Sequence, residues 1–170
     1  MGQVGAQMVQ TIFTLRPFVP DDLEKVSHIN QVCLPENYST YFFMDLYEKY
    51  PATFIVANVA GEIVGYIMCR IEAGLPSLGL FSLTKRGHVI SVAVLPAYQR
   101  KGIGEALMQE AMLGMRQYKA RECYLEVRMS NDAAIRLYQK LGFETSRTVH
   151  SYYADGEDAA IMTRKLPPIT

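Results

Sequence analysis

The sequence has few cysteines, no net charge and no long apolar run, and each absence excludes a class of protein. Cys33, Cys69 and Cys123 are isolated and odd in number, and they have neither the pattern of a disulfide framework nor metal-ligand spacing. We interpret them as reduced core thiols of a cytoplasmic protein. Seventeen basic and seventeen acidic residues cancel, which gives a general nucleic-acid or membrane-surface role no electrostatic support.

No apolar stretch approaches the roughly 18 residues that a membrane span needs, and the N-terminus lacks a basic-then-apolar signal pattern. Met1-Gly2 would suit myristoylation, but Ala6 stands where Ser or Thr is required. A length of 170 residues suits one domain. We therefore expect a flexible N-terminal tail over residues 1–10 and a single domain over residues 11–170, with no nucleic-acid or membrane partner.

The segment from His88 to Gly104 is the most informative part of the chain. Residues 89–95 form a Val- and Ile-rich run, which predicts a strand buried on both faces. The turn Gln99-Arg-Lys-Gly-Ile-Gly104 follows. A basic, glycine-containing turn that opens a helix favours an anion, because the first helical N–H groups are unpaired there. The alternative is a glycine-tolerant turn with solvated basic residues. The helix is predicted by apolar residues at helical spacing: Ile103, Leu107, Ala111, Met115 and Tyr118.

Two common phosphate-binding loops do not fit this turn. The dinucleotide fingerprint requires a third glycine shortly after Gly104, which this turn does not have. The Walker loop requires Gly-Lys-Ser/Thr, which the chain does not contain. The pattern Gln99-x-x-Gly102-x-Gly104 instead resembles the pyrophosphate-binding motif of the GCN5-related N-acetyltransferases (GNAT), Gln/Arg-x-x-Gly-x-Gly/Ala.

The remaining segments predict one α/β domain. Residues 73–85 are expected to form a loop, and Gly142 is expected to end the last helix. The order of elements agrees with the GNAT fold, a mixed central sheet of about six to seven strands flanked by about four helices. Besides the central strand and helix, we expect strands at 11–18, 53–59, 62–71, 121–128, 143–152 and 158–165, and helices from Pro20, from Ser39 to Lys49, and from Asn131 to Leu141.

Further segments narrow the resemblance. Residues 124–131 and 134–143 look like the second conserved block of the GNAT family. Leu34-Pro-Glu-Asn-Tyr38, Gly87-His88-Val89 and Tyr152-Tyr-Ala-Asp-Gly-Glu-Asp158 are similar to the catalytic subunits of protein N-terminal acetyltransferases. The resemblance is strongest to archaeal homologues of the NatA catalytic subunit, which are related to RimI. It implies acetyl-CoA as the donor and the free α-amino group of a protein as the acceptor.

The resemblance also implies which residues bind coenzyme A. The backbone of Val92, Ala93 and Val94 would hydrogen-bond the pantetheine arm. Tyr138 would lie near the CoA sulfur, where a phenol can donate to the leaving thiolate; alternatively, it is only an aromatic residue on the core face of its helix. Asn131 would contact the cofactor, and the turn would cradle the pyrophosphate with Arg100, Lys101, Gly102, Ile103, Gly104 and Glu105.

Catalysis requires a neutral amine, because an ammonium has no lone pair. The pKa of a free α-amino group is about 7.7–8.0, so a base has little work to do. The family positions make His88 and Glu126 the candidate bases, and they face each other if the two central strands pair. Either could hold a water that relays the proton. The alternatives are a structural histidine and a solvent-facing glutamate. Two ligands are too few for a dedicated metal site.

The acceptor is expected to lie between the loop at residues 34–38 and the last hairpin. Glu36 would bind the incoming ammonium or accept its proton, while Tyr38 and Tyr153 would form walls around the first peptide residue. Loop residues of this kind also serve as caps and hydrogen-bonding partners. The predicted substrate-binding residues are Leu34, Pro35, Glu36, Tyr38, Tyr152 and Tyr153.

Three functions stay open. The first is N-terminal acetylation of proteins by direct attack in a ternary complex. The acceptors could be nascent chains at the ribosome, and the enzyme could act with an auxiliary subunit or as a homodimer. The second is acetylation of a small amine or a lysine side chain, which the loops at 34–38 and 152–158 argue against. The third is a non-catalytic CoA-binding module, which predicts loss of the His, Glu and Tyr set that is present here. Arg70 and Glu72 flank Ile71 and receive no role.

Overall fold

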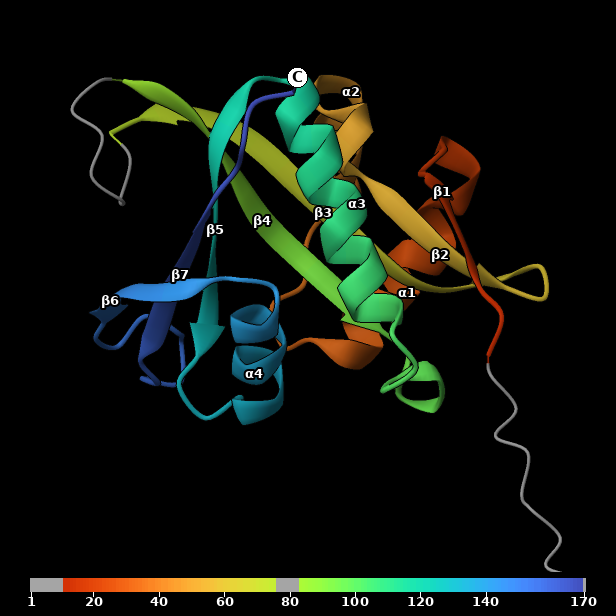
Figure 1. The fold of residues 1–170 in the computed structure, drawn as a ribbon. Coiled ribbons are helices and arrows are strands. Elements are labelled where there is room, and N and C mark those ends of the chain that lie inside the picture. Colours follow the sequence, from red (N-terminus) through yellow and green to blue (C-terminus); the bar gives the residue numbers. More distant parts are fainter. Residues whose placement is uncertain (1–10, 76–82, 170) are drawn as a thin grey trace, which may run out of the picture.

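A mixed sheet of seven strands forms the centre of the described part of the chain, in the order β1-β2-β3-β4-β5-β7-β6 (Figure 1). The computed structural model describes residues 11–75 and 83–169, so the tail expected at residues 1–10 lies outside the described residues. The sheet confirms the predicted mixed α/β architecture. Its strands are β1 (Thr14–Pro17), β2 (Ile55–Val59), β3 (Glu62–Gly74), β4 (Thr84–Val94), β5 (Ala120–Arg128), β6 (Glu144–Val149) and β7 (Ala159–Lys165).

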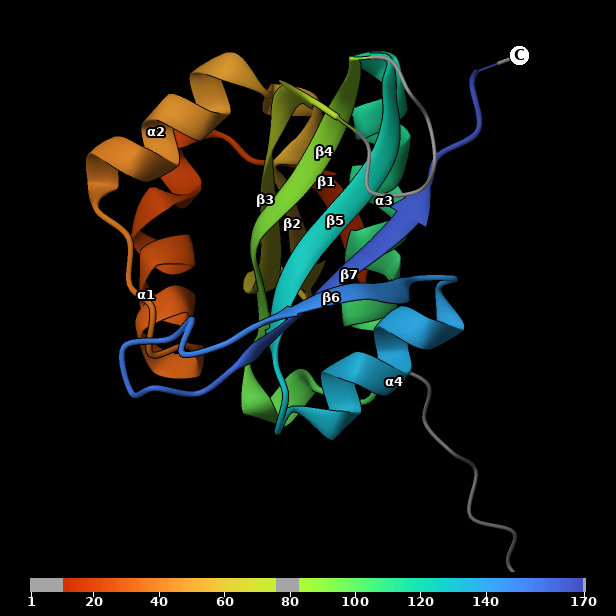
Figure 2. The ribbon, with the colours of Figure 1, turned by 90° about the vertical axis from the view of Figure 1, so that its left-hand side faces the viewer.

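Helices cover both faces of this sheet, as Figure 2 shows. One apolar cluster joins the sheet to the first two helices, and a larger cluster joins its other face to the last two. Within the described ranges, no helix is both long enough and apolar enough to cross a membrane. The α-helices of the described residues are α1 (Leu23–Cys33), α2 (Thr40–Lys49), α3 (Ile103–Gln117) and α4 (Asp132–Lys140).

Local signals set the ends of these helices. The Ser39 hydroxyl accepts a hydrogen bond from the Phe42 N–H at 3.2 Å and caps α2. The Asn131 side-chain oxygen accepts from the Ala134 N–H at 3.2 Å and caps α4 in the same way. Gly142 follows α4 with φ +84°, the left-handed conformation that favours glycine. The predicted ends of α2 and α4 therefore agree with the structure to within one residue, whereas α1 begins at Leu23, after a single 3-10 turn at Pro20–Asp22.

The parallel strands β4 and β5 pair at one end and separate toward the other (Figure 1). Their pairing runs from Lys85 with Ala120 to His88 with Tyr124 and then stops. Strand β4 continues to Val94, paired with β3 on its other side only. Beyond His88, the edge of β4 that faces β5 therefore has backbone groups that no strand of the described residues binds.

Two predicted boundaries are wrong. The stretch 73–85 is not entirely loop, because β3 extends to Gly74 and β4 begins at Thr84, while residues 76–82 lie outside the described ranges. The strands of the last hairpin, expected at 143–152 and 158–165, are shorter. Strand β6 ends at Val149, since Ser151 has φ +50° and its N–H donates to the Asp158 carboxylate at 2.8 Å. This contact closes a turn in place of further strand pairing.

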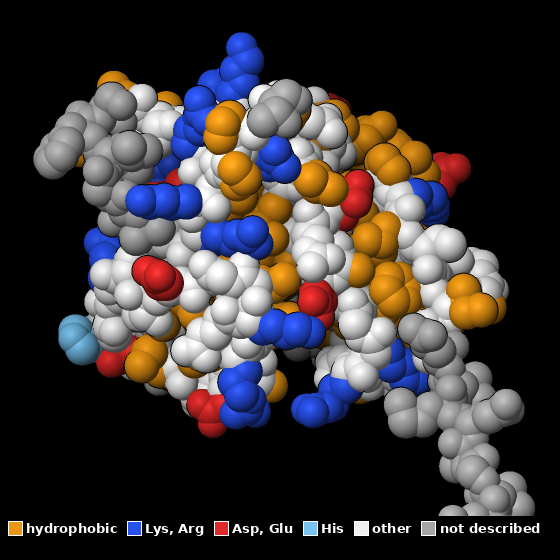
Figure 3. All heavy atoms as spheres, in the orientation of Figure 1, with side chains coloured by type: hydrophobic (Ala, Val, Ile, Leu, Met, Phe, Trp, Pro, Cys, Tyr) orange, Lys and Arg blue, Asp and Glu red, His pale blue; other side chains and the backbone are white. Residues whose placement is uncertain are grey.

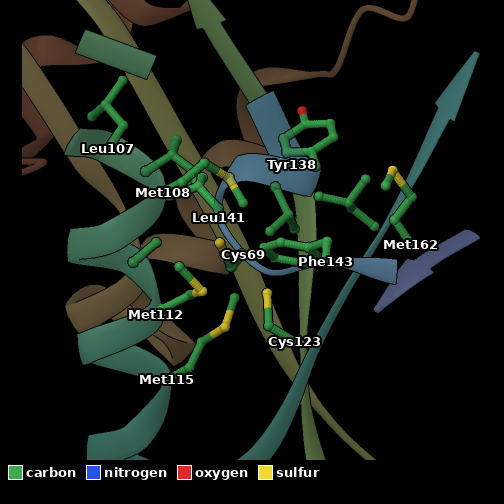
Figure 4. Packing of buried hydrophobic residues seen from close by; sticks show 14 of the residues in the cluster. Cys69, Leu107, Met108, Met112, Met115, Cys123, Tyr138, Leu141, Phe143 and Met162 are labelled. Atoms are coloured by element: carbon green, nitrogen blue, oxygen red, sulfur yellow. The ribbon is translucent and has the colours of Figure 1, made fainter. Parts of the chain in front are cut away.

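The core beneath α3 and α4 is rich in sulfur, as Figure 4 shows. Cys69 and Cys123 are free and buried, and burial raises the pKa of both thiols. Both are therefore inert, protonated core residues, as the sequence predicts. Cys33 differs from them because it is only half-buried and lies at the end of α1. The sulfur atoms around α3 come from Met108, Met112 and Met115.

Candidate active site

The turn before α3 presents backbone N–H groups that no side chain caps. Gly102 is the N-cap at φ +84° and forms no side-chain cap, so the N–H groups of Ile103, Gly104 and Glu105 lack the capping bond that α2 and α4 have. Arg100 is also left-handed, at φ +60°, a strained conformation that clusters at functional sites. Space at Gly102 is open, because a Cβ there would meet nothing within 4 Å. The turn is therefore suited to an anion.

A cavity of about 680 Å³ lies between this turn, the open edge of β4 and α4. Two residues predicted to bind the cofactor do not line it. The Ile103 side chain is 1% exposed and packs in the core, and Lys101 is exposed with its ammonium 5.9 Å from the Tyr98 ring centroid. The other predicted cofactor residues line the cavity: Val92, Ala93, Val94, Arg100, Gly102, Gly104, Glu105, Asn131 and Tyr138.

The edge of β4 that β5 leaves open runs from His88 to Val94, whose carbonyl is already bound by two side chains. This carbonyl accepts a hydrogen bond from the Gln99 amide at 2.9 Å and one from the Cys33 thiol at 3.6 Å, and neither donor belongs to a strand. Both Gln99 and Cys33 line the cavity. A ligand with amide groups along its length can bind this edge as a strand would, which fits the pantetheine arm of coenzyme A.

Arg136 and Lys140 are cavity residues that the sequence alone does not single out. They lie one turn apart on α4, and the Lys140 ammonium is 2.7 Å from the Glu105 carboxylate. Their i,i+4 spacing is the signal that could have placed them on one face. Figure 3 shows lysine and arginine side chains distributed over the face that carries α3 and α4. With the uncapped turn, these charges fit the phosphates of coenzyme A.

Tyr138 belongs both to the core and to the cavity. Its side chain is buried, its ring centroid lies 5.9 Å from that of Phe143, and Figure 4 shows the hydroxyl directed away from the sulfur-rich cluster. Burial raises the pKa of Tyr138 to about 12. The phenol therefore stays protonated near neutral pH and can donate a hydrogen bond into the cavity.

We expect Tyr138→Phe to lower kcat for the expected acetyl transfer about tenfold. This loss corresponds to about 1.4 kcal/mol, which is the size expected for one lost hydrogen bond. Since the pKa of Tyr138 is about 12, the wild-type phenol remains a donor throughout the assay range, and the loss should be the same from about pH 7 to about pH 9.5. Steady-state kinetics across this range would measure it, with exposed Tyr41→Phe as the control. A loss that disappears with rising pH would contradict a donor role.

His88 and Glu126 meet where β4 and β5 separate. The His88 Nε2 atom lies 2.7 Å from Oε2 of Glu126, as the predicted strand pairing requires. The His88 side chain is buried, and its ring stacks on Tyr124 with centroids 4.2 Å apart and planes at 15°. The ring is therefore held in one orientation, with Nε2 toward Glu126.

Glu72, to which the sequence alone assigns no role, reaches the other nitrogen of this ring. The His88 Nδ1 atom lies 3.2 Å from Oε1 of Glu72, which also accepts from Arg70 Nε at 2.7 Å. The Tyr124 hydroxyl donates to the second oxygen of Glu72. Burial acts to raise the pKa of Glu72, but the hydrogen bonds from Tyr124 and Arg70 outweigh it and hold this pKa below its usual value. The contact depends on the register of β3 against β4, which the sequence does not show.

Arg128, at the end of β5, connects the two predicted substrate loops. Its guanidinium lies 2.7 Å from Glu36 on one loop, and 2.8 Å and 3.0 Å from Asp155 and Glu157 on the other. It also lies 3.9 Å from the centroid of the Tyr153 ring. These hydrogen bonds, first among them the one with Glu157, raise the pKa of Arg128. Glu36 is thus already paired, and the loops are held at a fixed separation.

The tyrosines of these loops differ in exposure, since Tyr38 and Tyr153 are half-buried whereas Tyr152 is exposed. The Tyr38 hydroxyl is not free at the rim, since it donates to the Ile90 carbonyl at 3.3 Å. The Tyr152 and Tyr153 rings meet edge to face with centroids 4.9 Å apart. Burial is the main cause that raises the pKa of all three phenols, so they stay neutral. Leu34 lines the cavity and Pro35 is exposed, whereas the three tyrosines are not among the cavity-lining residues.

Among the described residues, no group of three or more His, Cys, Asp or Glu side chains is arranged to hold a metal ion. The two carboxylates beside His88 instead have hydrogen-bonding partners of their own, with Glu72 bound by Arg70 and Tyr124 and Glu126 in contact with the His88 ring. With a carboxylate at each of its nitrogen atoms, the His88 ring is suited to proton transfer.

Comparisons with known proteins agree with this geometry. Residues 23–143 match the model of the acetyltransferase (GNAT) family. An N-alpha-acetyltransferase of Sulfurisphaera tokodaii is 52% identical over 147 residues, which are 85% of this chain and 88% of that protein. The crystal structure of Ard1 from Thermoplasma volcanium is 34% identical with a TM-score of 0.77, over 91% of this chain and 98% of that one. Arabidopsis thaliana Naa50, solved with the bisubstrate analogue CoA-Ac-MVNAL, is 26% identical with a TM-score of 0.75, over 89% and 97% of the two chains.

Proposed function

This chain belongs to the acetyltransferase (GNAT) family, and we propose that it transfers an acetyl group from acetyl-CoA to the free α-amino group of protein N-termini. Relatives that are 52% and 49% identical are named N-alpha-acetyltransferases. The observation in this molecule that carries the proposal is the 2.7 Å contact between His88 and Glu126. This contact lies at the point where β4 and β5 stop pairing. Four residues further along β4, Val92 begins the part of the strand that lines the cavity.

The chain's own residues then have distinct roles in the reaction. When bound, acetyl-CoA supplies an activated acetyl thioester. The His88–Glu126 pair takes up the proton of the incoming ammonium through a water, which leaves the amine with its lone pair. Tyr138 donates a hydrogen bond at the sulfur end of the cavity. Burial raises the pKa of the Cys33 thiol, which keeps it protonated and favours direct attack by the amine over an acyl-cysteine route.

The acceptor approaches between the loops that Arg128 connects. An α-amino group sits on a Cα atom with backbone directly behind it, so it needs a short, wide entry with polar partners. A lysine amine sits at the end of a long flexible stem and needs a narrow channel. The paired loops with Tyr38, Tyr152 and Tyr153 support the first geometry. We propose that the preferred peptides begin with Ser or Ala, and with Met where Glu36 leaves room.

A panel of peptides tests this function directly. Peptides with a free N-terminal Ser or Ala are expected to exceed matched peptides with a blocked N-terminus and an internal lysine by at least about tenfold in kcat/KM, or about 1.4 kcal/mol. Mass spectrometry of the products locates the acetyl group. Equal or faster modification of the lysine would overturn the assignment in favour of side-chain acetylation.

Partners and location follow from this activity as further proposals. Protein N-termini are the acceptors, and we propose that nascent chains at the ribosome supply them in the cytoplasm. The free thiols of Cys33, Cys69 and Cys123 support a reducing compartment. An auxiliary subunit or a second copy of the chain is the partner that we propose for delivering these N-termini.

A further inference from the structure

His88 lies between two carboxylates that belong to different strands. Glu72 of β3 is 3.2 Å from Nδ1, and Glu126 of β5 is 2.7 Å from Nε2. A neutral imidazole has one N–H, whereas ionised carboxylates only accept hydrogen bonds. Both contacts are therefore satisfied only when two protons are shared among these three side chains. The position of each proton decides which atom can receive another one.

The two carboxylates differ in how firmly their negative charge is fixed. Glu72 accepts hydrogen bonds from the Tyr124 hydroxyl and from Arg70, which together stabilise it as an anion. Its pKa accordingly lies below the usual value. The side-chain contact that holds Glu126, within the part of the chain that the structure describes, is the one with His88. Glu72 is therefore the permanent acceptor, and Glu126 is the side on which a proton can come and go.

The surroundings of the ring reinforce this asymmetry. Tyr124 both stacks on His88 and donates to Glu72, so it fixes the ring and its acceptor together. The charged groups that face the ring from β3 are Arg70 and Glu72, and Glu126 faces it from β5. From β4, the Arg86 guanidinium lies 4.1 Å from the centroid of the Tyr124 ring, which stacks on His88. A half-turn of the imidazole would break the contacts of Nδ1 with Glu72 and of Nε2 with Glu126.

We propose that Glu72 is a positioning residue that keeps a proton on Nδ1 of His88, so that proton exchange takes place at Nε2 and Glu126. The inference rests on the proposed function, because it states how the pair handles the proton of the α-ammonium. The N–H bond of the ammonium breaks, its electron pair stays on nitrogen, and a water carries the proton to the Nε2–Glu126 side. The proton on Nδ1 does not move. The received proton later leaves to solvent from the same side.

Nitrogen NMR of the histidine rings tests the position of the proton without any substrate. The chain has three histidines, so a His88→Ala spectrum identifies the signals of His88. In the wild type, we expect the neutral ring to carry its proton on Nδ1, and we expect proton exchange to take place at Nε2. In Glu72→Leu, the neutral ring should place its proton on Nε2, toward Glu126. Glu72→Gln keeps an acceptor oxygen and should restore the Nδ1 tautomer.

Kinetics of the same variants connect the tautomer to the reaction. Glu72→Leu is expected to lower kcat near neutral pH by up to about tenfold, with both KM values within about twofold, and Glu72→Gln should recover part of the loss. Glu62→Leu, an exposed carboxylate on the same strand, should leave tautomer and kcat unchanged. If Glu72→Leu does not fold, Tyr124→Phe removes the donor to Glu72 but keeps the stacked ring, and it should shift the tautomer in the same direction.

An unchanged Nδ1 tautomer in folded Glu72→Leu, or in Tyr124→Phe where that variant replaces it, would overturn the role of Glu72. A kcat loss that appears without any tautomer change would do the same, because it would indicate a merely structural effect. The proposed function fails separately. If the wild type does not acetylate peptide N-termini while the tautomer switches as expected, Glu72 still positions His88, and the acceptor must be another amine.

Discussion

Replacing Gly102 with valine is expected to weaken acetyl-CoA binding by about 30-fold while the protein stays folded. A Cβ atom at this position meets nothing within 4 Å, so no clash forces the chain apart. The backbone conformation is the difficulty, because φ +84° is one that β-branched residues avoid. The turn must move to relieve this strain, and the first N–H groups of α3 then lose their alignment with the phosphates. One charge-assisted hydrogen bond contributes about 2 kcal/mol, which is about 30-fold in Kd.

Gly61 provides a matched control for this variant. It has φ +86°, it also has nothing within 4 Å of a built Cβ, and it lies in the hairpin between β2 and β3. Gly61→Val should therefore cost similar stability in thermal unfolding and leave the Kd for acetyl-CoA unchanged by calorimetry. Unchanged affinity in folded Gly102→Val, or equal weakening in both variants, would show that the phosphates do not bind at this turn.

Features that depend on neighbouring residues could be predicted from the sequence. Ser39 and Asn131 are caps whose hydrogen bonds reach only three residues ahead, and Gly142 ends its helix by its own φ preference. The apolar spacing after Ile103 placed one face of α3 in the core in the same local way. The turn before α3 belongs to this class, because its uncapped N–H groups follow directly from Gly102 at the start of a helix.

Features that depend on strand register could not be predicted in this way. Glu72 contacts His88 diagonally across β3 and β4, and a different register would place it elsewhere. Arg128 and Glu36 are 92 residues apart, and only the folded sheet brings them together. The ends of β3 and β4 were missed for the same reason, since the pairing of Gly74 with Thr84 extends both strands beyond their apolar runs. Long-range pairing therefore completes the site that local motifs only outline.

His88→Ala and Glu126→Gln are each expected to lower kcat by about tenfold near neutral pH, with little change in the peptide KM, because roughly a tenth of the amine is neutral there and the pair takes up the proton of the rest. The double variant should lose little more than either single variant, since the 2.7 Å contact makes the two side chains one unit. Exposed His28→Ala serves as the control, and thermal unfolding confirms that the variants are folded. Additive losses, or losses confined to KM, would contradict a shared proton relay.

The pH dependence of these losses separates a relay from a structural role. Below the amine pKa of about 7.7–8.0, most of the substrate is an ammonium and needs a group that takes its proton. Above that pKa, the substrate is already neutral, and the variants should recover toward the wild-type rate. Measuring kcat/KM from about pH 7 to about pH 9.5 therefore brackets the transition. Losses that stay constant across this range would mean that His88 and Glu126 hold the separated strands in place and do not move the proton.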